Sequence, residues 1–181
     1  MGVQSVQPVR ARGDEGFSLI ELLVVVAIVG IVSGISIPGL LRARVTGNET
    51  AAIGTLRSVN NAQASYAASA GRGGFATSLT ILGTPCGAAA DAFISPDLSP
   101  ATPGVTGVGT GVLKSGYQVD VAGNGVSGTV DCNSAATNTG YRATAVPQSI
   151  GVTGLRGFVT NNTGTIYFDP AGGTNATTPI Q

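Results

Sequence analysis

Apolar residues follow one another along residues 17–41, the longest hydrophobic run of the 181-residue chain. The run contains no lysine, arginine, histidine or aspartate, and its one acidic residue is Glu21, near its start. A helix of this length, rising about 1.5 Å per residue, can cross a hydrocarbon core of about 30 Å. The pattern therefore predicts a transmembrane helix over residues 17–41 that carries a costly carboxylate near one end.

Past the apolar run, the hydrophobic positions change to helical spacing. They recur at steps of three and four residues or their sums, with Ile53 beside them, at Val45, Ala52, Leu56, Val59, Tyr66 and Ala70. This stripe predicts an amphipathic half of the same helix over residues 42–70, ending before the glycine cluster that begins at Gly71. Pro38 lies among glycines near the junction of the two halves and predicts a kink there.

In the remainder of the chain, residues 71–181, several short segments carry the signals of strands joined by turns. Residues 83–113, rich in Gly, Pro, Ala and Thr, predict a long surface loop that covers Cys86. The remaining signals predict a hairpin with arms 117–121 and 126–130, a strand at 141–146, and a hairpin with arms 157–160 and 165–168. The predicted fold class is α+β, with four or five antiparallel strands over one amphipathic helix.

The sequence GFSLIE at residues 16–21 stands at the start of the apolar run, after a short charged leader. It resembles the class III signal of type IV prepilins and type II secretion pseudopilins. The resemblance implies that a prepilin peptidase cleaves between Gly16 and Phe17, removing residues 1–16, and then methylates the new amine of Phe17. Glu21 would become the fifth residue of the mature chain, and Pro38 falls where many pilins have a helix-kinking proline.

The same resemblance implies a pilin-like fold, in which residues 75–82 would pack the helix against a globular sheet head. The implied partners are identical subunits in a homopolymer, the prepilin peptidase, and an inner-membrane assembly platform with its ATPase. Basic residues of the leader, Arg10 and Arg12, favour a cytoplasmic leader. The implied location is the bacterial inner membrane, followed by an extracellular filament that serves adhesion or motility, or by the periplasm for a pseudopilin.

The carboxylate of Glu21 has a physical role in this interpretation. The amine created at Phe17 is as costly to bury as the carboxylate, and opposite charges a few ångström apart in a low dielectric cancel much of that cost. The pair can form within a subunit or between neighbours, and the resemblance favours neighbours. Two other interpretations are a plain membrane anchor whose Glu21 reaches the interface, and a cleaved secretory signal, for which the apolar run is too long.

Composition limits the chemistry of the chain. There is no histidine, and nine basic residues balance nine acidic ones. The basic residues beyond the leader are scattered, so no nucleic-acid partner is expected. The chain has no catalytic histidine, no nucleophile elbow and no phosphate loop, so we expect neither an enzyme nor a cofactor. Asp120, Asp131 and Asp169 lie near predicted turns, where binding to local backbone is expected before calcium, and we predict no metal site.

The chain has two cysteines, Cys86 and Cys132. In an exported domain, such a pair predicts a disulfide, because its spacing matches no zinc pattern.

Two main functions remain open at this point. One is a structural subunit of a type IV pilus filament, and the alternative is a type II secretion pseudopilin or a minor pilin. A membrane-anchored binding module is a third class, but the head's aromatic residues sit at strand positions and are expected in the core.

Overall fold

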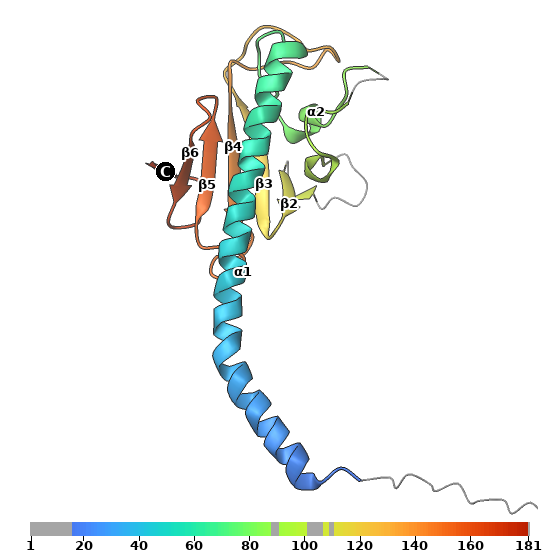
Figure 1. The fold of residues 1–181 in the computed structure, drawn as a ribbon. Coiled ribbons are helices and arrows are strands. Elements are labelled where there is room, and N and C mark those ends of the chain that lie inside the picture. The colour runs from blue at the N-terminus through green and yellow to red at the C-terminus, as the bar shows by residue number, and fades with distance from the viewer. Residues whose placement is uncertain (1–15, 88–90, 101–106, 109–110, 181) are drawn as a thin grey trace, which may run out of the picture. The chain divides into compact units, whose positions relative to one another are not determined.

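The computed structural model describes residues 16–87, 91–100, 107–108 and 111–180, and Figure 1 shows its ribbon. The chain divides into two compact units, one ending at Leu40 and the other beginning at Leu41. A single helix, α1 (Leu19–Ser69), contributes to both units, and Pro38 lies inside it. The predicted helix over residues 17–70 is therefore confirmed to within two residues at each end.

The first unit is the apolar half of α1. Its side chains are exposed on every side, apart from the half-buried Ser33. By length and composition, α1 is a helix that can cross a membrane. A helix that is hydrophobic all round requires lipid or other protein around it, because it has no polar face to present to water.

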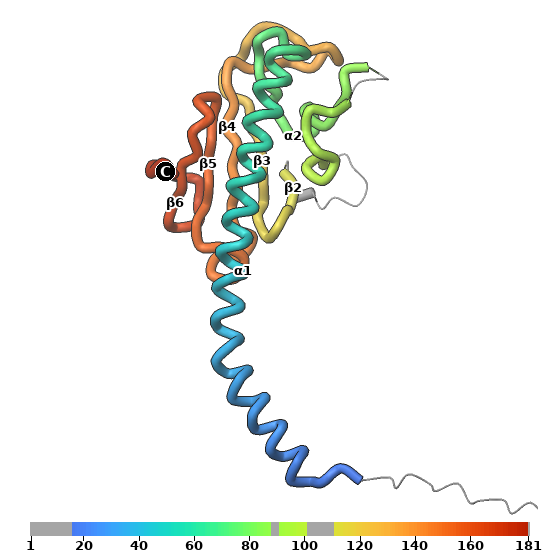
Figure 2. The backbone as a smooth tube through the Cα atoms, in the orientation of Figure 1, coloured from blue at the N-terminus to red at the C-terminus, as the bar shows by residue number. Residues whose placement is uncertain are grey.

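The second unit places the amphipathic half of α1 across one face of an antiparallel sheet (Figures 1 and 2). The predicted stripe faces the sheet: Leu56 and Val59 are fully buried, and Ala52, Tyr66 and Ala70 are nearly so. They pack against alternate residues of the sheet, which include Tyr117, Val119, Ala143, Ala145 and Phe158. The predicted pilin-like α+β fold, with one helix covering one sheet, is confirmed.

The sheet of the described residues has seven antiparallel strands in sequence order. They are β1 (Gly107–Val108), β2 (Gly111–Lys114), β3 (Tyr117–Asn124), β4 (Gly140–Pro147), β5 (Gly157–Asn161), β6 (Ile166–Asp169) and β7 (Thr178–Pro179). Five of them have four residues or more, whereas β1 and β7 have two each. The strand at 141–146 and the second hairpin are confirmed as β4 and as β5 with β6.

The first predicted hairpin was wrong. β3 pairs with β4 along its whole length, from Tyr117 opposite Pro147 to Asn124 opposite Gly140. Residues 125–139 form an excursion, a loop that leaves the sheet between the two strands. It contains a hydrogen bond of its own, from the N–H of Thr137 to the carbonyl of Thr129 at 3.1 Å. The predicted return strand at 126–130 lies in this excursion, where its valines are exposed and cannot contribute to a sheet core.

The predicted surface loop at 83–113 was also wrong in part. Residues 88–90, 101–106 and 109–110 lie outside the described residues. The rest contains a short 3₁₀ helix, η1 (Pro96–Leu98), strand β1 and the first residues of β2. Ile94 and Leu98 are 5% and 1% exposed. These apolar side chains cover one edge of the core. The composition of the segment, dominated by small and polar residues, hides this contribution in the sequence.

The top of α1 is fixed by polar contacts to the segment that follows it. The fully buried side-chain amide of Gln63 donates to the carbonyl of Ala76 and accepts from its N–H, at 3.0 and 2.9 Å. The short helix α2 (Leu79–Leu82) then buries its first and last residues against the core. The segment at 75–82 therefore packs α1 against the head, as the resemblance to pilins implied.

Candidate functional site

The predicted cleavage position lies in an open part of the described chain. Gly16 precedes α1 outside any helix or strand, and a Cβ built on it would meet no other described atom within 4 Å. Phe17, on the other side of the same peptide bond, is 73% exposed. The predicted leader up to residue 15 lies outside the described residues. The described residues therefore leave the bond between Gly16 and Phe17 accessible.

Glu21 makes a contact that the sequence analysis missed. Its Oε2 accepts a hydrogen bond from the backbone N–H of Ser18 at 3.0 Å. This is the glutamate half of a capping box, in which the third residue of a helix bonds back to the N-cap N–H. The signal was readable as S-x-x-E at residues 18–21. In the single chain, Glu21 thus satisfies one of the free N–H groups at the start of α1.

Phe17, which precedes α1, lies near Glu21 in the first turn of the helix. Both line one shallow hollow, together with Ile20, Val24 and Val25. Cleavage would free the amine of Phe17, and the carboxylate of Glu21 is predicted to pair with such an amine. The structure therefore places these two residues close together. Whether the pair forms between subunits stays a prediction, as do the cleavage, the methylation and the kink at Pro38.

One end of the sheet head is attached to α1 by an ion pair with a buried carboxylate, which the sequence did not reveal. Glu49 is 5% exposed, and its Oε2 accepts from Nε and Nη2 of Arg156 at 3.0 and 2.6 Å. Its Oε1 accepts from the backbone N–H groups of Leu155 and Arg156 at 3.0 and 3.2 Å. The Arg156 guanidinium also lies over the rings of Phe158 and Phe168.

These contacts decide the ionisation of Glu49. Burial favours the neutral form, but the hydrogen bonds from Arg156 and Leu155 and the charge of Arg156 outweigh it and lower the pKa of Glu49. Burial and the nearby charge of Glu49 raise the pKa of Tyr117 to about 12. Its hydroxyl remains protonated and donates to the carbonyl of Arg156 at 2.9 Å.

We expect Glu49→Gln to lower the free energy of unfolding of the head by about 1 to 3 kcal/mol. This is below the full cost of breaking a buried pair, because the Arg156 side chain is 42% exposed. Since folding lowers the pKa of Glu49, its contribution is present above the unfolded value and lost as pH falls through the folded one. The variant should therefore lose part of the acid dependence of stability below about pH 4.5.

Urea unfolding followed by circular dichroism at several pH values measures both effects. The matched control is Asp97→Asn, which removes the more exposed pair of Asp97 with Lys114, where we expect a change under about 1 kcal/mol. Equal losses in the two variants would contradict a special role for Glu49.

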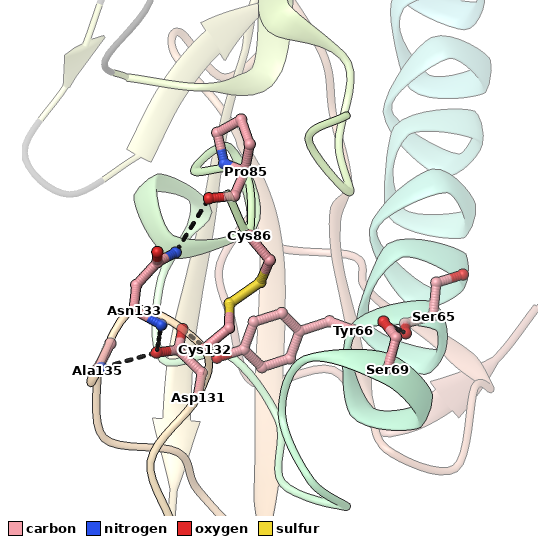
Figure 3. Close-up of a disulfide and its surroundings, with 9 residues drawn as sticks. All are labelled: Ser65, Tyr66, Ser69, Pro85, Cys86, Asp131, Cys132, Asn133 and Ala135. Atoms are coloured by element: carbon pink, nitrogen blue, oxygen red, sulfur yellow. Dashed lines mark hydrogen bonds between the residues drawn. A yellow bond between two sulfur atoms is a disulfide. The ribbon is translucent and has the colours of Figure 1, made fainter. Parts of the chain in front are cut away.

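The predicted disulfide is confirmed: Cys86 and Cys132 are joined, with 5.7 Å between their Cα atoms. Figure 3 shows how α1 reaches this bond through Tyr66. The hydroxyl of Tyr66 donates to Oδ2 of Asp131 at 2.9 Å, and both side chains are buried. Burial and the Asp131 carboxylate raise the pKa of Tyr66 above its usual range. The disulfide, the excursion at 125–139 and the top of α1 therefore form one connected structure.

Removing the disulfide, by Cys86→Ser with Cys132→Ser, should lower the free energy of unfolding by about 4 kcal/mol. The disulfide joins residues 46 positions apart, so it closes a long loop and lowers the conformational entropy of the unfolded chain. Denaturant midpoints with and without reductant measure the effect, and thiol titration of the unreduced, unfolded protein should find no free thiol. Two free thiols per chain would contradict the pairing.

The aspartates near turns bind local backbone, as predicted. Asp131 accepts through Oδ1 from the N–H groups of Asn133 and Ala135. Asp169 accepts from the N–H groups of Ala171 and Asn175. Asp120 lies within β3, and its Oδ1 accepts from the N–H of Val121 at 2.8 Å. In the part of the chain that the structure describes, no three acidic or cysteine side chains gather in a group suited to a metal ion.

Comparison with known proteins places the N-terminal segment in a recognised class. Residues 11–37 match the family model described as the prokaryotic N-terminal methylation motif. A segment of 39 residues is 51% identical to the type IV wide pilus major component PilA4 of Thermus thermophilus. That match covers 22% of this chain and 30% of the relative. No solved structure matches the chain.

The chain thus carries a class III prepilin-type signal followed by a pilin-like α+β fold. The predicted resemblance to type IV pilins is confirmed for the N-terminal segment. The matched segment is short, so the assignment of the sheet head rests on its fold.

Proposed function

We propose that this chain is a structural subunit of a type IV pilus. One observation carries the proposal: the methylation motif at residues 11–37 occurs together with an apolar half of α1 that is exposed on every side. The motif supplies a route for processing, and the exposed helix requires a partner along its whole length. The similarity of the N-terminal segment to the major component of a wide pilus supports a filament rather than a single anchor.

In this proposal the subunit is first anchored in the inner membrane, with its leader in the cytoplasm and its sheet head on the opposite side of the membrane. A prepilin peptidase cuts after Gly16 and methylates Phe17, and an assembly platform driven by an ATPase passes the subunit into the filament. Side chains that faced lipid then face the apolar helices of neighbouring copies. This exchange keeps the apolar surface away from water at every stage.

Electron microscopy of sheared surface material, probed with an antibody to residues 111–180, tests the proposal. We expect label at regular intervals along filaments, and loss of those filaments when the gene is deleted. Label confined to the periplasm would contradict the proposal and indicate a pseudopilin. Label restricted to rare sites on filaments of another protein would indicate a minor pilin.

A further inference from the structure

A tight turn of apolar residues lies beside the start of the second unit. In residues 149–155, which we call the apolar turn, the side chains of Ile150, Val152 and Leu155 are 61%, 70% and 54% exposed. The turn forms one wall of a groove of about 540 Å³. The other wall is α1, with Leu41, Arg42, Val45 and Thr46. A monomer in water gains nothing from exposing three large apolar side chains together.

The backbone of the apolar turn is bonded to itself. The N–H of Gly151 donates to the carbonyl of Gly154 at 2.8 Å, and those of Val152 and Thr153 donate to the carbonyl of Ser149 at 3.1 and 2.9 Å. The N–H of Ser149 donates in turn to the hydroxyl of Thr153 at 3.1 Å. Satisfied N–H groups lower the cost of moving a turn from water toward hydrocarbon.

The apolar turn is also fixed at one height along α1. The side-chain amide of Asn48 donates to the carbonyl of Thr153 at 2.9 Å, and the N–H of Leu155 donates to the buried Glu49. Leu41, the last residue of the apolar run, lines the same groove as Val152. The turn is therefore anchored about two helical turns beyond the point where the predicted span ends, and its groove reaches back to that point.

We propose that the apolar turn enters the outer interface of the inner membrane before the subunit is assembled. The inference rests on the proposed function in one respect, because the apolar half of α1 must span the bilayer. The occupant of the groove is then the phospholipid surface itself, because Leu41, where the predicted span ends, lines the groove together with Arg42. The turn gives the subunit a second membrane contact besides its helix.

The charges around the groove fit this occupant. Residues 148–155 contain no charged side chain, and the Arg156 that follows is engaged by Glu49. Arg42 lines the groove and Arg44 follows it on α1, and both are exposed. Guanidinium groups this close to the predicted end of the span can bind lipid phosphates beside the apolar side chains of the turn.

The test uses the absence of tryptophan from the natural chain. Single variants Val152→Trp, Val126→Trp and Val29→Trp of the unprocessed full chain are reconstituted into vesicles of phosphatidylethanolamine and phosphatidylglycerol. Quenching is measured with lipids brominated high or low on the acyl chain. Val126 is the matched control, because it is 82% exposed but lies in the excursion at 125–139. Leu155→Trp repeats the measurement from the same turn.

We expect Val152→Trp to be quenched several-fold more strongly than Val126→Trp, mainly by lipids brominated high on the chain. Quenching of Val29→Trp by deep bromines, with Val152→Trp no different from the control, would overturn the inference and leave the span intact. An unquenched Val29→Trp would overturn both. Emission of Val152→Trp that changes with protein density but not with brominated lipid would assign the groove to a second copy and overturn the lipid proposal.

Discussion

Gly16→Leu is expected to leave the chain uncut in the inner membrane and to abolish filaments. Gly16 lies in open surroundings, where an added side chain meets no other atom of the described chain. The substitution should therefore leave the fold unchanged, and its effect should arise in the active site of the peptidase, which must accept the residue before the cut. Because an uncut subunit has no free amine at Phe17, assembly should fail together with processing.

Mass spectrometry of the intact protein and its N-terminal peptide measures this outcome. The natural chain should begin at a monomethylated Phe17, and the Gly16→Leu chain at its original start. Gly54→Ala is the matched control, because its added carbon also meets no atom, and it lies beyond the signal in the amphipathic half of α1. Normal cutting of Gly16→Leu, or a natural mature chain that keeps its leader, would contradict the processing scheme.

The parts of the molecule that the sequence predicted well are those specified by neighbouring residues. The apolar run, the stripe on α1 and the hairpin of β5 with β6 each depend on spacing within a few residues. The disulfide followed from the presence of two cysteines in an exported chain, because two cysteines allow a single pairing within the chain. The cap made by Glu21 belongs with these, since S-x-x-E is a local signal that was overlooked.

The parts that were missed depend on residues far apart in the chain. β3 and Val126–Val130 form a plausible local hairpin, but β3 gains more from β4, whose small residues Ala143 and Ala145 are fully buried in the core. Glu49 interrupts the apolar stripe, which indicates a buried pair, yet its partner Arg156 lies 107 residues away. No local pattern identifies such a partner.

Loss of the charge at Glu21 is expected to abolish filaments while leaving the subunit in the membrane. Removing a carboxylate makes the span more apolar, so insertion should be unchanged or improved. The buried amine of Phe17 would lose its counter-charge, at a cost of about 3 to 5 kcal/mol for each interface. This cost recurs at every subunit of the filament, which is why we expect a complete failure of assembly.

The helix cap that Glu21 makes is a second possible reason for failed assembly, and its effect must be separated from that of the charge. Glu21→Ala removes both the charge and the acceptor for the N–H of Ser18, and the lost cap alone costs about 0.5 to 2 kcal/mol. Glu21→Gln keeps an amide oxygen that can accept from Ser18, as glutamine does in other capping boxes, but carries no charge. Glu21→Asp keeps the charge and shortens its reach, so partial assembly is expected.

Fractionation of Glu21→Gln cells into membrane-bound subunit and sheared filament therefore tests the central claim most directly. Both fractions are quantified by immunoblot against the natural chain, with processing verified by the mass of the mature protein. The charge-pair account predicts normal membrane levels, a normally cut and methylated Phe17, and no filament. A normal filament yield from Glu21→Gln would contradict it, and would assign Glu21 to the helix cap alone.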